Sequence, residues 1–353
     1  MLAMGMFGYI GDYVLWWVLF LSLVVHAWCF FRFFPRKKYR KAGLVLGNGF
    51  VFLCMLGAAG LIGESHYRFI CVQTDSFGLS LPAQRWFAIH TRLNSLGCRD
   101  HEWQLGDPPH VRRVAFVGDS FTYGWGLEHV EDRFPDRIQA MFDSDATGTV
   151  EVLNVAKPGW STSQEIQPIQ DMIRRYGVDE VVLCYVANDI ERLLPRTGEF
   201  NPIVPPQPSW FNPDSSCLLY HLYFRIVVPR AATVAGYHDW LAAGFADPYI
   251  WQAHQEEFRQ IIAICRQSGV TLRVALLPFI RSRGSAFRSE EIHGKVRAFF
   301  AQEGIDVVDL QPTFAATEAG DLVVNGADPH PNELAHKLMA DAIWRAFYTG
   351  SVP

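Results

Sequence analysis

A serine follows the point where a predicted buried strand meets a glycine. Val114–Val117 is a short apolar run of the kind found in strands buried on both faces, and Gly118 permits a sharp turn before Asp119 and Ser120. Reactive groups in open α/β sheets collect at the carboxyl ends of the strands. Ser120 is therefore a candidate nucleophile, provided that a base takes its proton. The alternative is that Asp119 or Ser120 only caps the helix that follows.

A histidine that could be this base lies near the C-terminus, where residues 326–332 read Gly-Ala-Asp-Pro-His-Pro-Asn. His330 could accept the serine proton, while Asp328 could fix the tautomer of the imidazole and stabilise its charged form. A histidine beside prolines is also common in surface loops. His336, on the predicted last helix, is expected to pack in the interior or to face solvent.

Two further segments could supply donors to an oxyanion. Gly159 ends the sequence Asn-Val-Ala-Lys-Pro-Gly after the second predicted strand, and a glycine N–H can approach a developing negative charge closely. Asn188 follows the third predicted strand in the sequence Val-Ala-Asn-Asp-Ile, and amide side chains serve as donors in oxyanion holes. Both residues also suit ordinary turns.

From residue 113 onward, short apolar runs alternate with longer segments of helical period, which predicts a parallel sheet with crossover helices. The predicted strands are Val114–Val117, Val150–Asn154, Glu180–Tyr185, Thr271–Leu277 and Asp306–Asp309. The predicted helices are Pro135–Phe142, Ser163–Arg175, Tyr249–Ser268, Ser289–Glu303 and Asn332–Tyr348. The fold class is therefore α/β, a three-layer α/β/α sandwich with a parallel sheet of about five strands, over residues 113–353.

Two segments do not follow this alternation. Residues 63–112 are expected to form a tether that packs on the catalytic domain and could add an edge strand, with Tyr67–Val72 as the strand-like run. Residues 194–247 form a long insertion, proline-rich at first and apolar over Leu218–Val228, as is typical of a lid or a binding wall. The apolar part is expected to form a packed cap helix; docking on a membrane surface is the alternative.

The first 62 residues contain two long apolar runs, predicted as transmembrane helices over about residues 13–33 and 42–62. Each run is long enough to cross a hydrocarbon core. The loop between them, residues 32–41, is dense in Lys and Arg, so the positive-inside rule places it in the cytoplasm. Everything after residue 62 is then expected in the periplasm or the extracellular space. A cleaved signal peptide is the alternative.

The composition is mildly acidic, with 31 Lys and Arg against 36 Asp and Glu, and no basic stripe indicates a nucleic-acid partner. The seven cysteines have no C-x-x-C spacing, and neither a metal nor another cofactor is expected. Four of the cysteines would lie in an oxidising compartment, where disulfides are allowed: Cys71, Cys98, Cys217 and Cys265.

Taken together and in order, Gly-Asp-Ser, the glycine, Asn-Asp and Asp-x-His-Pro-Asn resemble the four sequence blocks of the SGNH hydrolase superfamily, the GDSL esterases and lipases. The resemblance covers residues 113 to 349. It implies Ser120 as nucleophile, His330 as base, and an oxyanion hole made of the Ser120 N–H, the Gly159 N–H and the Asn188 side chain.

The last block departs from the commonest family pattern. That pattern has an aspartate three residues before the histidine, where this chain has Ala327. Asp328 stands two residues before it, a spacing also seen in branches similar to alginate O-acetyltransferases, and Asp309 is a possible substitute.

The resemblance implies a serine esterase that works through an acyl-serine, and the two predicted spans imply that it is anchored in a membrane and faces outward. An O-acetyltransferase or O-deacetylase acting on a surface or secreted polysaccharide would use the same residues, and the substrate is expected to be an acylated glycan or lipid. A non-catalytic binding protein with this fold is a third reading. Tyr123, Trp125 and Trp160 lie near the predicted site, where they could stack on sugar rings or pack in the core.

Overall fold

The structure is a computed structural model that describes residues 2–35, 38–145, 149–195, 215–231, 236–280 and 289–349. The chain divides into two compact units, one from residues 1–86 with 205–231 and one from residues 87–204 with 232–353. The proline-rich part of the predicted insertion, from residue 196 to residue 214, lies outside the described residues.

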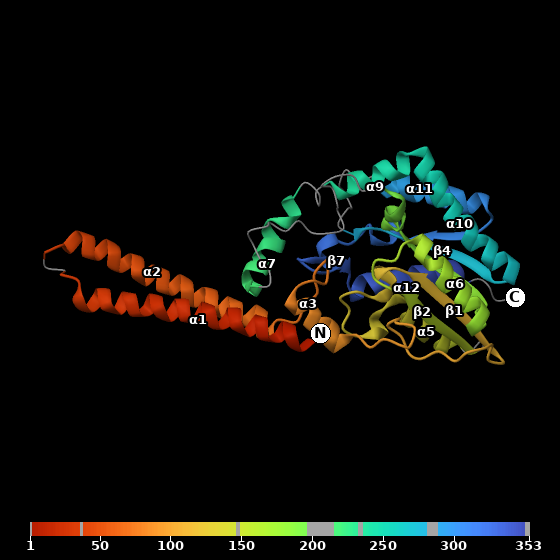
Figure 1. The fold of residues 1–353 in the computed structure, drawn as a ribbon. Coiled ribbons are helices and arrows are strands. Elements are labelled where there is room, and N and C mark those ends of the chain that lie inside the picture. The colour runs from red at the N-terminus through yellow and green to blue at the C-terminus, as the bar shows by residue number, and fades with distance from the viewer. Residues whose placement is uncertain are drawn as a thin grey trace. The chain divides into compact units, whose positions relative to one another are not determined.

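The second unit is built on a single parallel sheet (Figure 1). Its strands are β1 (Val111–Gly118), β2 (Thr149–Ala156), β3 (Glu180–Val186), β4 (Thr271–Leu277) and β5 (Asp306–Asp309). They lie in the order β2-β1-β3-β4-β5, and every neighbouring pair is parallel. The five predicted strands are confirmed; β1, β2 and β3 extend beyond their predicted ends, and β4 and β5 have the predicted bounds.

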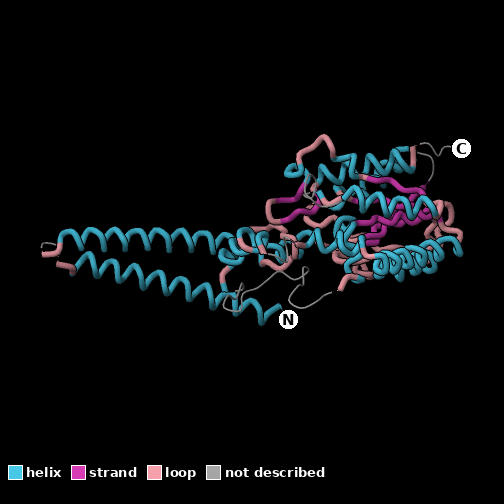
Figure 2. Tube along the Cα trace, turned by 90° about the horizontal axis from the view of Figure 1, so that it is seen from above, coloured by secondary structure: helices cyan, strands magenta, loops and turns pink. Residues whose placement is uncertain are grey.

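Helices cover both faces of this sheet (Figure 2). One face packs on α5 (Phe134–Asp145) and α12 (Glu333–Phe347). The other packs on α6 (Thr162–Tyr176), α10 (Pro248–Ser268) and α11 (Ser289–Gln302). The predicted three-layer sandwich is therefore confirmed.

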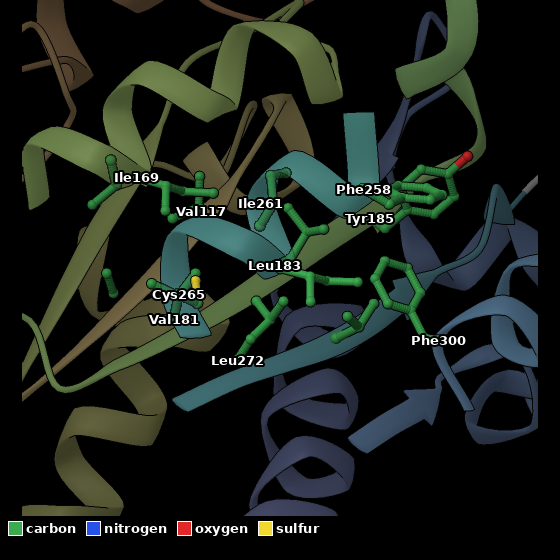
Figure 3. Close-up of a cluster of buried hydrophobic side chains, with 14 of the residues drawn as sticks. Val117, Ile169, Val181, Leu183, Tyr185, Phe258, Ile261, Cys265, Leu272 and Phe300 are labelled. Atoms are coloured by element: carbon green, nitrogen blue, oxygen red, sulfur yellow. The ribbon is translucent and has the colours of Figure 1, made fainter. Parts of the chain in front are cut away.

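The side chains of each strand alternate between the two layers, as the pleat requires. In β1, Val114 and Phe116 join the cluster under α5 and α12, while Ala115 and Val117 join the cluster under α6 and α10. Figure 3 shows the second cluster, where Leu183 of β3 lies among side chains of α10. Strands buried on both faces explain why the sequence gives continuous apolar runs in place of alternating ones.

Shorter elements connect these layers. They are α4 (Ser120–Tyr123), η2 (Val130–Asp132), η3 (Ala187–Leu193), α9 (Tyr237–Ala246), η7 (Gln311–Phe314) and η8 (Ala319–Leu322). A small antiparallel pair, β6 (Val323–Asn325) and β7 (Asp328–Pro331), precedes α12. The sequence predicted no strand in this stretch.

The first unit begins with two long helices, α1 (Leu2–Phe33) and α2 (Arg40–Ser65), which contact each other. Within them, Ile10–Phe33 and Arg40–Ile70 are long and apolar enough to cross a membrane. Their outward side chains are apolar and open to the surroundings; Val45 is 73% exposed and Phe52 is 65% exposed. These two helices could anchor the chain in a membrane.

The predicted strand at Tyr67–Val72 is wrong. The chain continues from α2 into a π-helical turn, η1 (His66–Ile70), and no strand forms between residues 63 and 110. The reason is an ion pair at helical spacing: Arg68 Nε lies 2.7 Å from Glu64 Oε1, and both side chains are buried. Helix α3 (Leu81–His90) follows, with Trp86 buried.

The apolar stretch of the insertion forms helix α7 (Cys217–Ile226) and a short turn, η5 (Val228–Arg230). The sequence favoured a packed helix here, and the residues on which α7 packs belong to α2 and η1 in the first unit. All seven cysteines of the chain carry free thiols.

Candidate active site

Ser120 is the first residue of α4, directly after β1. The cap of this short helix is Asp119, whose carboxylate accepts the N–H of Phe121 at 2.9 Å. Because Asp119 caps the helix, the Ser120 hydroxyl is free for another partner. Gly118 is required just before the turn, since a Cβ there would overlap Thr122 Oγ1 and lie 3.0 Å from the Cys184 carbonyl oxygen.

The partner of the Ser120 hydroxyl is His330. Nε2 of the imidazole lies 2.9 Å from Ser120 Oγ, although 210 residues separate them in the chain. Nδ1 of the same ring lies 2.6 Å from Asp328 Oδ1, and the backbone N–H of His330 donates to the same oxygen at 3.1 Å. Asp328 is fully buried, which fixes its carboxylate against the ring. Strand β7 thus delivers both residues to the end of β1.

Two aromatic rings hold the imidazole in place. Trp125 stacks on His330 with 5.2 Å between ring centroids and 27° between planes. Phe121 meets the imidazole edge to face at 5.6 Å. The sequence left open whether Trp125 packs in the core or stacks on a sugar, and its packing on the histidine was missed. The only feature of the sequence that points to this contact is the position of Trp125, five residues after Ser120. Tyr123 is a buried core residue.

The loops after the flanking strands lie beside this group. Strand β1 lies between β2 and β3, so the ends of these three strands are neighbours at one sheet edge, where open α/β sheets bind ligands. Asn188, in η3 after β3, donates from Nδ2 to Asp119 Oδ2 at 3.1 Å. The Asp119–Asn188 bond therefore ties the predicted donor to the residue before the serine.

The loop that carries Gly159 is fixed to the end of β1. The Lys157 N–H donates to the Gly118 carbonyl at 3.3 Å, and the Trp160 N–H closes the turn on the Lys157 carbonyl at 3.2 Å. Gly159 has φ +76°, a conformation that favours glycine, and it is exposed. Its N–H therefore lies on an accessible turn next to the strand that ends at the serine.

Besides Asp328, three further carboxyl groups are buried around this edge of the sheet: Asp119, Glu165 of α6 and Asp189 of η3. Burial raises the pKa of Asp119, although the N–H groups of Phe121 and Asn188 oppose the rise. Burial, strengthened by the negative charge of Asp119, raises the pKa of Glu165 well above its usual range, and burial does the same for Asp189. No motif in the sequence indicates this group of buried acids.

Other candidates lie elsewhere. Asp309, the possible substitute for Asp328, pairs with His293 Nδ1 at 2.8 Å and with Arg297 at 3.0 Å. His336 is fully buried; its Nδ1 accepts the Phe134 N–H at 3.1 Å, and burial lowers its pKa to about 3. The described residues contain no group of three or more His, Cys, Asp or Glu side chains that could hold a metal ion.

Comparisons with known proteins identify the family of this chain. Residues 116–338 match the model of the GDSL-like lipase/acylhydrolase family. No curated protein sequence matches the chain.

Solved structures give distant likenesses. A lipolytic protein of the G-D-S-L family from Veillonella parvula is 17% identical, with a TM-score of 0.41, over 67% of this chain and 98% of that one. The lipase Lip_vut3 from a goat rumen metagenome is 14% identical, with a TM-score of 0.44, over 67% of this chain and 98% of that one. The esterase EstA from a Pseudoalteromonas species is 12% identical, with a TM-score of 0.42, over 67% and 97%.

The family match covers more than half of the chain and spans every residue from the serine to the histidine. The chain therefore belongs to the GDSL-like lipase/acylhydrolase family and is a serine hydrolase that acts on ester bonds.

Proposed function

We propose that this hydrolase is a membrane-anchored esterase that cleaves carboxylic esters through an acyl-serine intermediate. The observation that carries the proposal is the continuous chain from Ser120 Oγ to His330 Nε2 at 2.9 Å and from His330 Nδ1 to Asp328 Oδ1 at 2.6 Å. A nucleophile, a base and an orienting carboxylate are within hydrogen-bond reach of one another, as this chemistry requires.

In the first step, Ser120 Oγ attacks the ester carbonyl and its proton passes to His330 Nε2. Asp328 accepts the Nδ1–H and stabilises the imidazolium that forms. When the tetrahedral intermediate collapses, the carbon–oxygen bond of the ester breaks and the alcohol leaves with the proton from Nε2. A water molecule then attacks the acyl-serine, again with His330 as base, and releases the acid.

The oxyanion is proposed to be held by the Ser120 N–H, the Gly159 N–H and the Asn188 side chain. The Asn188 amide carries two N–H groups, and only one is needed for the bond to Asp119. Asp119 therefore fixes the orientation of the amide and leaves its second N–H available to the oxyanion. Donors that are fixed in advance are the effective ones, because they need no reorganisation during the reaction.

The direct test is labelling of Ser120 with a fluorophosphonate probe on the full chain in detergent. The wild-type protein should be labelled, and the Ser120→Ala variant should not. Ser144→Ala is the matched control, because Ser144 is exposed on α5 and bonds only to its own helix at Ala140. A folded wild-type sample that stays unlabelled would favour the reading as a non-catalytic binding protein.

The acyl acceptor distinguishes hydrolysis from transfer. An O-acetyltransferase acting on a polysaccharide would use the same three residues, with a sugar hydroxyl in place of water. Turnover of a soluble aryl acetate should be unaffected by added oligosaccharide if the enzyme is an esterase. Faster turnover together with an acetylated oligosaccharide would identify a transferase, and release of acetate from an acetylated glycan would identify a deacetylase.

The membrane location rests on the two apolar helices and on the cations between them. With residues 32–41 in the cytoplasm, the catalytic unit faces the periplasm or the outside of the cell. A reporter that is active only outside the cytoplasm, fused after residue 66, should be active, and one fused at residue 38 should be inactive. The reverse pattern would refute the outward orientation.

A further inference from the structure

The first unit contains a cavity of about 300 Å³ between α1, α2 and the start of α7. It is lined by Trp16, Leu19 and Phe20 of α1, by Gly57 and Gly60 of α2, and by residues at the start of α7. Engineered apolar cavities of about half this volume, roughly 150 Å³, already bind benzene. The volume is therefore sufficient for part of a hydrocarbon chain.

The polar groups at the end of the cavity are fully engaged. The Glu64 carboxylate accepts from Ser216 Oγ at 2.6 Å, from the Leu218 N–H at 2.9 Å and from Arg68 Nε at 2.7 Å. A stable buried water needs two to four polar partners. With these groups already bonded to each other, the cavity favours an apolar occupant.

We propose that this cavity binds one ester-linked acyl chain of a membrane lipid. The inference rests on the proposed membrane anchoring, because the walls belong to the segments Ile10–Phe33 and Arg40–Ile70. Lipid chains are the apolar molecules that surround such helices. A free fatty acid fits less well, since its carboxylate would approach Glu64, whereas an ester group carries no charge.

The space depends on the glycines of α2. A Cβ at Gly57 would come within 2.8 Å of the Phe20 ring, which shows how closely α1 approaches there. A Cβ at Gly60 would meet nothing within 4 Å. A side chain added at Gly60, which lines the cavity, would therefore begin in open space and reduce the cavity volume. Gly49 of the same helix is equally open but does not line the cavity, so it provides a matched control.

The experiment uses the full chain in phosphatidylcholine vesicles that contain a phosphatidylcholine with a photoactivatable acyl chain. After illumination, mass spectrometry should locate the adducts on the residues that line the cavity. Gly60→Leu should reduce these adducts several-fold, and Gly49→Leu should leave them unchanged. Leu23→Phe narrows the cavity from α1 and serves as a second variant if Gly60→Leu does not fold.

Unchanged labelling in both cavity variants, or adducts spread evenly along α1 and α2, would overturn the proposal. Stronger labelling by a photoactivatable free fatty acid than by the phosphatidylcholine would overturn the assignment to an ester-linked chain. Extraction at alkaline pH separates the hypothesis of membrane anchoring from the hypothesis of a lipid site in the cavity. A wild-type protein that leaves the membrane refutes both, whereas one that stays with unaltered labelling in the variants refutes only the lipid site.

Discussion

At the scale of the residue, the orientation of the His330 imidazole depends on the buried carboxylate of Asp328. Asp328→Asn should lower kcat by about 10⁴-fold, because the amide no longer favours the tautomer in which Nε2 accepts the serine proton. Steady-state kinetics on a soluble aryl ester measure this loss. KM should change little, since Asp328 is buried behind the ring.

The matched control for that change is Asp309→Asn. Asp309 also bonds to a histidine at 2.8 Å, but that histidine is His293 on α11. Its replacement should leave kcat close to the wild-type value. An equal loss in the two variants would mean that the Asp328 effect is structural and would contradict the assigned role.

A second prediction at this scale concerns Glu165 and pH. Burial raises the pKa of Glu165 well above its usual value of 4.5, so the folded protein holds a proton that the unfolded chain releases. Above about pH 4.5 the folded state therefore binds more protons than the unfolded chain does, and the free energy of unfolding falls as pH rises. Glu165→Gln keeps the shape of the neutral acid and removes this contribution.

The measurement is thermal unfolding of the wild type and the variant between pH 5 and pH 8. The fall in melting temperature over this range should be smaller in Glu165→Gln. Glu256→Gln is the control, because the Glu256 side chain is 62% exposed on α10. An identical fall in Glu165→Gln and the wild type would show that Glu165 is ionised in the fold.

At the scale of the element, two glycines in the second unit should respond to alanine in opposite directions. Gly118→Ala places a Cβ against Thr122 and the Cys184 carbonyl at the end of β1, so it should destabilise the fold and displace Ser120. Gly294 lies within α11, and a Cβ there meets nothing within 4 Å. Gly294→Ala should stabilise the protein by about 0.4–1 kcal/mol. Denaturant unfolding measures both, and equal effects would contradict the packing at Gly118.

Elements with one dominant signal could be predicted from the sequence. The strands around Val114–Val117 and Glu180–Tyr185 are buried on both faces, so each contains an uninterrupted apolar run, which in the second strand begins at Val181. The turn at His66–Ile70 could not be predicted in this way, since its helical form depends on a buried ion pair one turn apart. Strand β7 was not predicted, because it contains two prolines and its antiparallel pairing with β6 spans only a few residues.

The catalytic residues of the candidate site could be predicted from residue type and order along the chain. The contacts that depend on packing in the folded protein could not. Ser120, His330 and Asp328 stand in a recognisable order, and the structure brings these three together. The contact of Trp125 with the imidazole requires the fold, since any aromatic residue near the serine would read the same way in the sequence. The Asp119–Asn188 bond joins loops 69 residues apart and has no local signal.

At the scale of the whole molecule, the first unit depends on a buried charge pair. The Glu64 and Arg68 side chains are 4% and 1% exposed. Glu64→Leu would leave the Arg68 charge buried without its carboxylate and should destabilise the unit by about 3–5 kcal/mol. Replacing both by Leu should restore much of the loss, because a buried pair contributes little net stability.

Thermal unfolding of the full chain in detergent tests this prediction. The double variant should melt well above Glu64→Leu. A double variant that melts no higher than the single one would mean that the bonds from Ser216 and Leu218 to Glu64, and not the charge of Arg68, hold α7 in place.

The bond between Glu64 and Ser216 joins residues 152 positions apart. During translation, α1 and α2 leave the ribosome long before α7 is made, and β1, β2 and β3 are synthesised in between. At about 5–20 residues per second, the nascent hairpin waits roughly 8–30 seconds for its last helix. Throughout that interval Glu64 lacks its α7 partners, so a truncated product ending before residue 215 should be a preferred target of membrane quality control.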